Sequence, residues 1–285
     1  MQQKSLHWYP GHMQKAMRQI EEKLKLIDIV VEVVDSRIPL SSKNPFLENL
    51  TASKKRLLVF SKKDLVDINE LKPFENYYKE KGYMTVIADL NNSNDINLIK
   101  KGIAKAGEER QQKYIKRGMK PQAIRTLILG IPNVGKSTLI NKLSRTTKAS
   151  VANTPGHTRS QQWIKVDKTL ELLDTPGILP PHYEDKKYAI NLALTGAMKV
   201  ENLGVSELFE ELMKVLLNRS KDNFIKRYDL TVEDLVDNTA ILRAVGKRRG
   251  LIVNGGEVDL DRAELLILKE YKEGMISKIV LDELC

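Results

Sequence analysis

The stretch GIPNVGKST, residues 130–138, constrains the fold more than any other part of this 285-residue chain. It follows the apolar run AIRTLILG and precedes LINKLSRTT, which predicts a strand, a glycine-rich turn and a helix in succession. In that context it matches the pattern G-x-x-x-x-G-K-[ST]. Glycines let backbone N–H groups wrap a phosphate, and the N-terminal end of a helix dipole favours the same negative charge. The stretch therefore predicts a phosphate-binding turn.

The side chains of this turn have distinct expected roles. Lys136 would supply a positive charge to the β and γ oxygens of a nucleotide, and Ser137 would place its hydroxyl on Mg²⁺. The nucleotide-binding positions expected in and beside the turn are Asn133, Val134, Gly135, Lys136, Ser137 and Thr138.

A second phosphate-linked motif is LELLDTPG at residues 170–177, where a strand is predicted to end in an aspartate. Asp174 would hold Mg²⁺ through water, and the N–H of Gly177 can approach a γ-phosphate because no side chain blocks it. Between the two motifs, Thr158 is the candidate for a hydroxyl that binds Mg²⁺ only when a γ-phosphate is present. Thr154 is the alternative.

The segment VFSKKDL, residues 59–65, resembles the guanine-reading motif Asn-Lys-x-Asp at the end of a strand. Asp64 would accept hydrogen bonds from guanine, whereas adenine presents a lone pair and no amine there and would be repelled. Ser61 stands where Asn is usual, and one neutral hydrogen bond is worth roughly 1 kcal/mol, so guanine binding would be weakened but not abolished. An ATP-using protein is the alternative that Ser61 leaves open. The nucleotide-binding positions expected here are Ser61, Lys62, Lys63 and Asp64, with Ala88 and Asp89 backing the guanine ring.

The order of these motifs is circularly permuted, because the guanine reader precedes the phosphate-binding turn. Such an order is physically possible because the termini of a domain are often close together. The motifs WYPGHM, VVDSRIP, SKKD, GIPNVGKST, NTPGHTR and DTPGIL follow one another, and LALTGAMK comes next. On these motifs the sequence resembles the circularly permuted GTPases that act as ribosome assembly factors.

The resemblance implies a GTPase that binds GTP and Mg²⁺ and acts late in assembly of the large ribosomal subunit, as a release or checkpoint switch. The implied partner is a precursor of that subunit, with its rRNA and ribosomal proteins, and the subunit is expected to stimulate hydrolysis. The alternative from another functional class is a nucleotide-gated RNA-binding module with negligible hydrolysis. Off the ribosome a monomer is expected.

GTP hydrolysis also needs a group that orients or activates the attacking water. Many GTPases place a glutamine after Asp-x-x-Gly, but here that position is Ile178, which cannot hydrogen-bond water. The resemblance favours His12 as the catalytic residue, with His157 as runner-up, and the alternative is that His12 and Trp8 only anchor the N-terminus. The resemblance also suggests Asn133 as a K⁺ ligand, against the alternative that it only stabilises the turn.

The fold expected is α/β: a P-loop GTPase domain with a mostly parallel sheet and helices on both faces, followed by a small all-α domain. Apolar runs at 28–35, 56–61, 84–89 and 123–130 predict strands, and helical patterns lie between them. One of these helices is expected to end at Gly107. All ten prolines lie at or before Pro181, so we expect domains at 1–183, binding GTP, and 184–285, contacting the ribosome or RNA.

The expected helices of the second domain have recognisable ends. Ser206 would cap the start of one helix, and Thr231 with Asp234 forms a near capping box at the start of another, which would close on Gly246. A last helix would close on Gly274. The turn between the third and fourth contains the basic cluster 247–249, which either contacts rRNA phosphates or is simply solvated.

Charge and composition bound the partners. The net charge is +10, with 31 basic against 18 acidic residues up to Tyr183 and 16 against 19 after it. A basic surface favours a polyanionic partner such as RNA. The basic segment 106–122 either contacts RNA or is a solvated connector made by the permutation. The only cysteine is Cys285, and no apolar run is long enough to span a bilayer, so a cytoplasmic protein without membrane contact is expected.

Overall fold

The structure is a computed structural model that describes residues 11–145, 162–180, 185–199 and 203–284. Its centre is a six-stranded sheet in the order β3-β2-β1-β4-β6-β5, parallel except for β5. The strands are β1 (Ile29–Asp35), β2 (Lys55–Ser61), β3 (Met84–Ile87), β4 (Ile124–Leu129), β5 (Gln162–Lys165) and β6 (Leu170–Asp174). The expected strands and the mostly parallel sheet are confirmed, and β5 is an addition that the sequence did not reveal.

Helices cover both faces of this sheet. They are α1 (Gly11–Lys23), α2 (Pro45–Leu50), α3 (Ile68–Glu80), α4 (Ser93–Lys116) and α5 (Lys136–Arg145). In β2, Leu58 and Phe60 belong to one buried cluster with Phe74 of α3, whereas Leu57 joins another cluster with Ile99 of α4. Because successive side chains of a strand point to opposite faces, α3 and α4 lie on opposite sides of the sheet.

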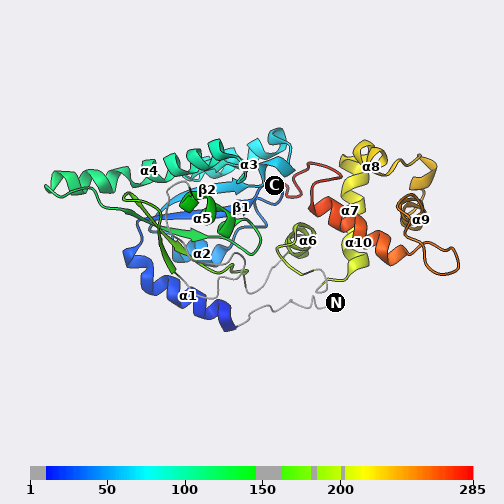
Figure 1. Cartoon of the computed structure of the whole chain (residues 1–285), viewed down its shortest axis with the longest axis horizontal. Helices are drawn as coiled ribbons and strands as arrows, with labels where there is room; N and C mark the ends of the chain where they lie inside the picture. The colour runs from blue at the N-terminus through cyan, green and yellow to red at the C-terminus, as the bar shows by residue number, and fades with distance from the viewer. Residues whose placement is uncertain (1–10, 146–161, 181–184, 200–202, 285) are drawn as a thin grey trace.

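A helical part follows, with α6 (Lys186–Thr195), α7 (Val205–Arg219), α8 (Lys221–Tyr228), α9 (Asn238–Arg248) and α10 (Leu260–Lys272). In Figure 1 the sheet and its helices occupy one end of the molecule and α7, α8, α9 and α10 the other. The expectation of an all-α second part holds for the residues described. The boundary between domains at 183 and 184 stays a prediction.

Three expected helix ends in this part are wrong. Ser206 lies inside α7, whose N-cap is Gly204, and its hydroxyl donates to Glu264 at 3.0 Å. Gly246 lies within α9, where a Cβ would come 2.2 Å from Val258 Cγ1, so this glycine serves close packing and not a helix end. Thr231 and Asp234 do not cap α9: the Thr231 N–H donates to Asp234 ahead of a separate 3-10 turn at Glu233–Leu235, and Asp237 caps α9. Gly274 does follow α10 in the left-handed region expected of a helix end.

The helix end expected at Gly107 is also wrong. Helix α4 continues through it to Lys116, so residues 106–116 of the expected connector are helical. A Cβ on Gly107 would lie 2.6 Å from Ile124 Cδ1, and the missing side chain therefore lets α4 approach the start of β4. No helix within the described ranges combines the length and apolar character needed to cross a membrane.

The chain's C-terminal segment, residues 276–283, returns from the helical part to the sheet. Val280 joins the buried cluster of Phe60 and Phe74, and the Leu281 N–H donates to the Arg37 carbonyl at 2.7 Å. The buried carboxylate of Asp282 accepts hydrogen bonds from the Leu40 and Ser41 N–H groups at 2.6 and 2.8 Å. The loop after β1 is therefore held by the far end of the chain.

Gly130, the first residue of the phosphate-binding turn, should not tolerate a side chain. Its φ is +147°, and a Cβ would lie 2.5 Å from the Val33 carbonyl oxygen. We expect Gly130→Ala to lower the free energy of unfolding by about 2–3 kcal/mol, measured by urea denaturation. Gly82→Ala is the matched control, because Gly82 also has a positive φ of +83° but nothing within 4 Å. Equal losses in both variants would show that backbone strain alone, and not the close contact, sets the cost.

Candidate functional site

The predicted nucleotide-binding segments meet at one edge of the sheet. Residues 61–64 follow β2, residues 88–89 follow β3, the turn at 130–135 follows β4, and Asp174 ends β6. These four strands are parallel, so their carboxyl ends share an edge, where ligands bind in open α/β sheets. The order of the motifs along the chain does not affect this meeting.

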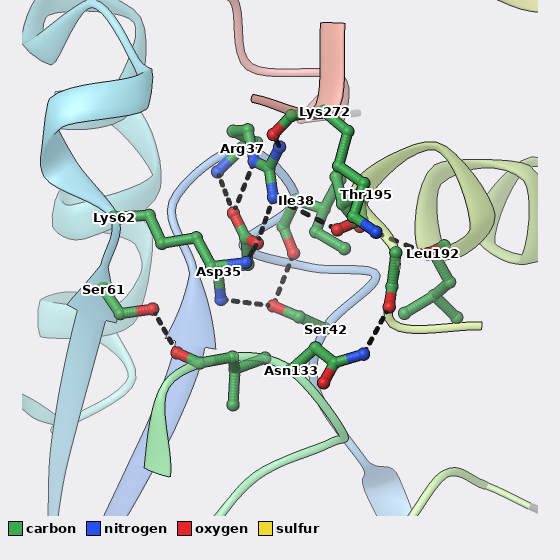
Figure 2. Close-up of polar contacts among 12 residues, drawn as sticks. Asp35, Arg37, Ile38, Ser42, Ser61, Lys62, Asn133, Leu192, Thr195 and Lys272 are labelled. Carbon is green, nitrogen blue, oxygen red and sulfur yellow. Dashed lines mark hydrogen bonds and ion pairs between the residues drawn. The ribbon is translucent and has the colours of Figure 1, made fainter. Parts of the chain in front are cut away.

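Ser61 joins the guanine-reading segment to the phosphate-binding turn. Its hydroxyl is buried and lies 2.9 Å from the Val34 carbonyl oxygen. It also lies 2.7 Å from the Val134 carbonyl oxygen of the turn (Figure 2). Val134 is therefore fixed to the end of β2 through its backbone. Reading of the base by Ser61 remains a prediction, since this hydroxyl is directed at carbonyl groups.

Lys136 begins α5 and reaches back into the turn. Its ammonium donates to the Ile131 carbonyl at 2.7 Å, and the side chain is 7% exposed. Burial lowers the pKa of Lys136 to about 8, against the attraction of the Asp174 carboxylate, which raises it. A phosphate bound beside this buried ammonium would attract it more strongly than it would attract an exposed lysine, because burial lowers the effective dielectric constant.

The hydroxyl-bearing residues next to Lys136 are open to solvent. Ser137 and Thr138 are exposed in the first turn of α5, whereas Asp174 is buried at the end of β6. Thr175 donates its hydroxyl to the Ile128 carbonyl at 2.7 Å, which fixes the segment after Asp174 to β4. The turn thus presents free hydroxyl groups, and the next strand presents a carboxylate.

Gly177 is needed for contact between its segment and the turn. A Cβ there would lie 2.7 Å from the Pro132 nitrogen and 2.8 Å from the Pro132 Cα. The Ile178 N–H donates to the Gly130 carbonyl at 3.4 Å, and the Ile178 side chain is buried in the core. The side chain at the position usual for a water-orienting glutamine is therefore turned into the protein.

The guanine-reading segment and the segment expected to back the base lie side by side. The Lys63 N–H donates to the Ala88 carbonyl at 3.3 Å, and its ammonium is 3.3 Å from a carboxylate oxygen of Asp95. The same Asp95 oxygen accepts from the Asp89 N–H at 2.8 Å. Asp64 is exposed in a 3-10 turn directly after Lys62. Hydrogen bonds therefore hold the two segments together, and their contact with a base remains a prediction.

Asp35, at the end of β1, has a central position that sequence reasoning missed. Arg37 pairs with both of its carboxylate oxygens, Nε at 3.0 Å and Nη2 at 2.8 Å, and the Lys62 ammonium lies 2.7 Å from Oδ2. Figure 2 shows both cations directed at the one carboxylate. Burial alone would raise the pKa of Asp35, but the charges of Arg37 and Lys62 hold it well below its usual range.

Arg37 also reaches two helix ends of the helical part. Its Nη1 donates to the Lys272 carbonyl at 2.8 Å, and its Nη2 lies 3.3 Å from the Thr195 carbonyl oxygen. These carbonyls end α10 and α6, where a positive charge is favoured by the helix dipole. The guanidinium therefore connects β1, α6 and α10 in one buried contact.

Asn133 makes a second contact between the turn and α6. It has a φ of +61°, and its side-chain amide donates to the Gly196 carbonyl at 2.6 Å. Gly196 itself ends α6 with a φ of +81°. The phosphate-binding turn is thus joined directly to the end of a helix outside the sheet.

Several predicted residues lie outside the description of the structure. Thr158, Thr154 and His157 belong to the residues that are not described, as does Trp8. The backbone of His12 lies in the first turn of α1, but its side chain is outside the described set. Their roles remain predictions.

Comparison with known proteins agrees with this geometry. A family model described as a 50S ribosome-binding GTPase matches residues 125–243. Ribosome biogenesis GTPase A of Bacillus cereus is 41% identical over 279 residues, which cover 97% of this chain and 93% of that protein. This chain belongs to the ribosome biogenesis GTPase A family. Mitochondrial ribosome-associated GTPase 1 of Mus musculus is 31% identical, covering 96% of this chain and 89% of that protein.

Solved structures share the fold of this family member. GDP-bound YlqF has a TM-score of 0.67 at 24% identity, covering 93% of this chain and 99% of that one. GNP-bound YlqF from T. maritima has a TM-score of 0.65 at 24% identity, covering 95% and 100%. The fold expected from the sequence, a P-loop GTPase with a mostly parallel sheet, is confirmed.

The residues of this GTPase fit a nucleotide with Mg²⁺. Within the described part of the chain, no three His, Cys, Asp or Glu side chains are grouped to hold a metal. In a GTPase, Mg²⁺ takes few ligands from the protein and the rest from phosphates and water. The exposed hydroxyl of Ser137 and the Asp174 carboxylate supply the oxygen donors that this requires.

Nucleotide affinity in this GTPase should depend on pH through Lys136. A bound phosphate raises the pKa of Lys136 above its value of about 8, so binding takes up a proton once the pH exceeds 8. Affinity is therefore full well below pH 8 and falls as the pH rises through 8 and beyond. We expect a fluorescent GTP analogue to bind about 8-fold more weakly at pH 9 than at pH 7.5. Lys136→Met should bind weakly with no such dependence; an equally steep loss in that variant would assign the proton to another group.

Proposed function

We propose that this GTPase is a switch in late assembly of the large ribosomal subunit. It binds GTP and Mg²⁺, docks on a precursor of that subunit, and hydrolyses GTP as a release or checkpoint step. The observation that carries this proposal is the meeting of Ser61, Asp89, Lys136 and Asp174 at one sheet edge. Further support comes from the relatives, whose names describe ribosome biogenesis, ribosome association and 50S ribosome binding.

The phosphates and the metal have a defined set of proposed ligands. Lys136 holds the β and γ oxygens, aided by the backbone of the turn and the N-terminus of α5. Ser137 and Asp174 hold Mg²⁺, and Thr158 adds a hydroxyl when a γ-phosphate is present. The remaining proposed nucleotide-binding residues of this region are Asn133, Val134, Gly135, Thr138 and Gly177.

Guanine selectivity is assigned to Asp64. Its carboxylate is exposed in the 3-10 turn that adjoins residues 88–89, where it can accept from the base. Lys62, Lys63, Ala88 and Asp89 form the surrounding walls. Ser61 supports the pocket through the Val134 carbonyl, which explains how serine replaces asparagine without loss of the turn.

His12 is proposed as the catalytic residue. The support is indirect: the Ile178 side chain is buried, so another group must orient the attacking water. Because α1 begins at Gly11, His12 lies at a helix start that is continuous with the Pro-Gly turn. The second candidate function, an RNA-binding module with negligible hydrolysis, is favoured by the same burial of Ile178.

Asn133 is proposed as a K⁺ ligand through its side-chain oxygen. Its amide nitrogen already donates to Gly196, which leaves Oδ1 facing elsewhere as an acceptor. In this proposal the end of α6 orients the asparagine. Potassium would then stimulate turnover only while α6 keeps its place.

The nucleotide state is proposed to set the orientation of the helical part. The chain passes from Gly177 to α6 through few residues, and α6 touches both the turn, through Asn133, and Asp35, through Arg37. A movement of Gly177 on loss of the γ-phosphate would therefore reach α6 directly. The protein is further proposed to act in the cytoplasm, as a monomer when it is off the ribosome.

Turnover with isolated large ribosomal subunits tests these proposals together. In K⁺ buffer we expect GTP hydrolysis by the wild type to rise when subunits are added, because the partner completes the catalytic site. His12→Ala should lose about 100-fold of the stimulated rate, the size of a general acid–base contribution. Phosphate release under multiple turnover is the measurement.

Two controls separate the outcomes of this experiment. Sedimentation with subunits shows whether His12→Ala still binds them, and Na⁺ at equal ionic strength shows whether K⁺ takes part. Full stimulated turnover by His12→Ala would show that His12 is not catalytic and only anchors the N-terminus. No turnover under any condition would favour the RNA-binding module, and equal rates in K⁺ and Na⁺ would remove the Asn133 site.

A further inference from the structure

A groove runs along the sheet edge opposite the nucleotide-binding segments. Its first hollow, about 530 Å³, is lined by the starts of β1 and β2 and by the last turns of α4. Its second, about 620 Å³, is lined by the starts of β2 and β3 and the end of α3. Lys54 and Lys55 line both hollows, so the two adjoin along this edge.

Cationic side chains dominate this groove. Arg110, Lys113 and Arg117 project from α4 at spacings that place them on one helix face, and Lys81 comes from the end of α3. Arg117 is exposed, and its side chain has no hydrogen bond or ion pair with any residue that the structure describes. A polyanion would find an unused positive charge there.

The three carboxylates of the groove do not cancel its charge. Glu109 is shared by Lys55 and Lys113, at 2.6 and 3.3 Å, so a single carboxylate faces two ammonium groups. Asp28 pairs with Arg110, and Glu48 is bonded to the Tyr83 hydroxyl. The groove keeps a net positive charge around both hollows.

Each hollow also contains a tyrosine. Tyr114 lies in the first, with the Arg110 guanidinium 5.4 Å from its ring centre. Tyr83 lies in the second, where the Lys43 ammonium is 4.6 Å from its ring centre and Tyr78 packs against it edge-on. Bases of single-stranded RNA stack on aromatic rings and arginine planes, whereas a duplex keeps its bases paired and offers mainly its backbone. A positive groove that holds the Arg110–Tyr114 pair in its first hollow suits unpaired nucleotides.

We propose that this groove is an RNA-binding site for a single-stranded segment, separate from the nucleotide site. The strand β2 joins the two, with Lys55 in the groove and Ser61 beside the phosphate-binding turn. Seven residues of strand span about 20 Å, so RNA in the groove leaves the GTP pocket open. In Figure 1 the last turns of α4 extend past the sheet, away from α7, α8, α9 and α10. The site goes beyond the proposed switch, because RNA binding here needs no GTP.

Binding of a fluorescein-labelled 20-nucleotide single-stranded RNA to the full chain, followed by anisotropy over a range of KCl concentrations, tests this site. Lys113→Gln with Arg117→Gln removes two groove charges. We expect about 10-fold weaker binding at 0.1 M salt and a salt slope shallower by about 1.4, the value for two lost phosphate contacts. Tyr114→Leu should weaken binding about 5-fold or more without changing the slope.

The matched control is Lys101→Gln with Lys105→Gln. These lysines are exposed on the same helix at the same spacing, and they lie outside both hollows. This variant should bind RNA like the wild type, and basal GTP turnover should be unchanged in both double variants. Equal losses in the two would show that only general surface charge is involved. Equal binding of a duplex, or stronger binding of a polyglutamate peptide of matched charge, would also overturn the proposal.

Discussion

A single buried carboxylate, that of Asp35, carries the connection between the nucleotide-binding edge and the rest of the molecule. A carboxylate with almost no exposure is stable only when it is paired, and here Arg37 and Lys62 both pair with it. Lys62 belongs to the guanine-reading segment, whereas Arg37 binds the carbonyl ends of α6 and α10. Removal of Asp35 would leave the buried Arg37 guanidinium without a counter-ion, so this carboxylate holds the three parts together.

Close backbone contacts also hold the segments of this edge together. Gly130 touches the Val33 carbonyl, and Gly177 touches Pro132, so the segments after β4 and β6 lie directly against each other and against β1. Ser61 adds a hydroxyl bridge to Val134. A shift of one segment therefore displaces the others, because closely packed backbones leave no space to absorb the movement. In a GTPase, such contact is what a change at the γ-phosphate needs in order to move neighbouring segments.

Much of this edge was predictable from the sequence because each motif directly follows an apolar run. Once the runs are parallel strands, Lys136, Asp174 and the 61–64 segment must share an edge, whatever their order along the chain. Arg37 could not be assigned in the same way. Its partners at Thr195 and Lys272 are main-chain carbonyls, and these have no sequence signature. The motif VVDSRIP was visible, but the role of its arginine was not.

The glycines show the same limit. Gly274 follows the end of α10 with a positive φ, and local chemistry was enough to predict that. Gly107 and Gly246 look alike in sequence, yet both lie inside helices because Ile124 and Val258 occupy the space of a side chain. Only tertiary packing separates the two kinds of glycine. For the same reason the length of α4, and with it the basic groove, could not be read from the sequence.

Hydrogen exchange of Arg37→Lys, followed by mass spectrometry of the nucleotide-free chain, tests the central role of the Asp35 contact most directly. Lysine keeps a charge beside Asp35 but cannot also hold the carbonyls of Thr195 and Lys272. We expect amide exchange to be about 10-fold or more faster in two places at once. One is around Leu65 in the reading segment, and the other is at Ala197 and Met275, after α6 and α10. Exchange in β4 should be unchanged. Faster exchange in only one of these places, or in neither, would contradict a connection through Arg37.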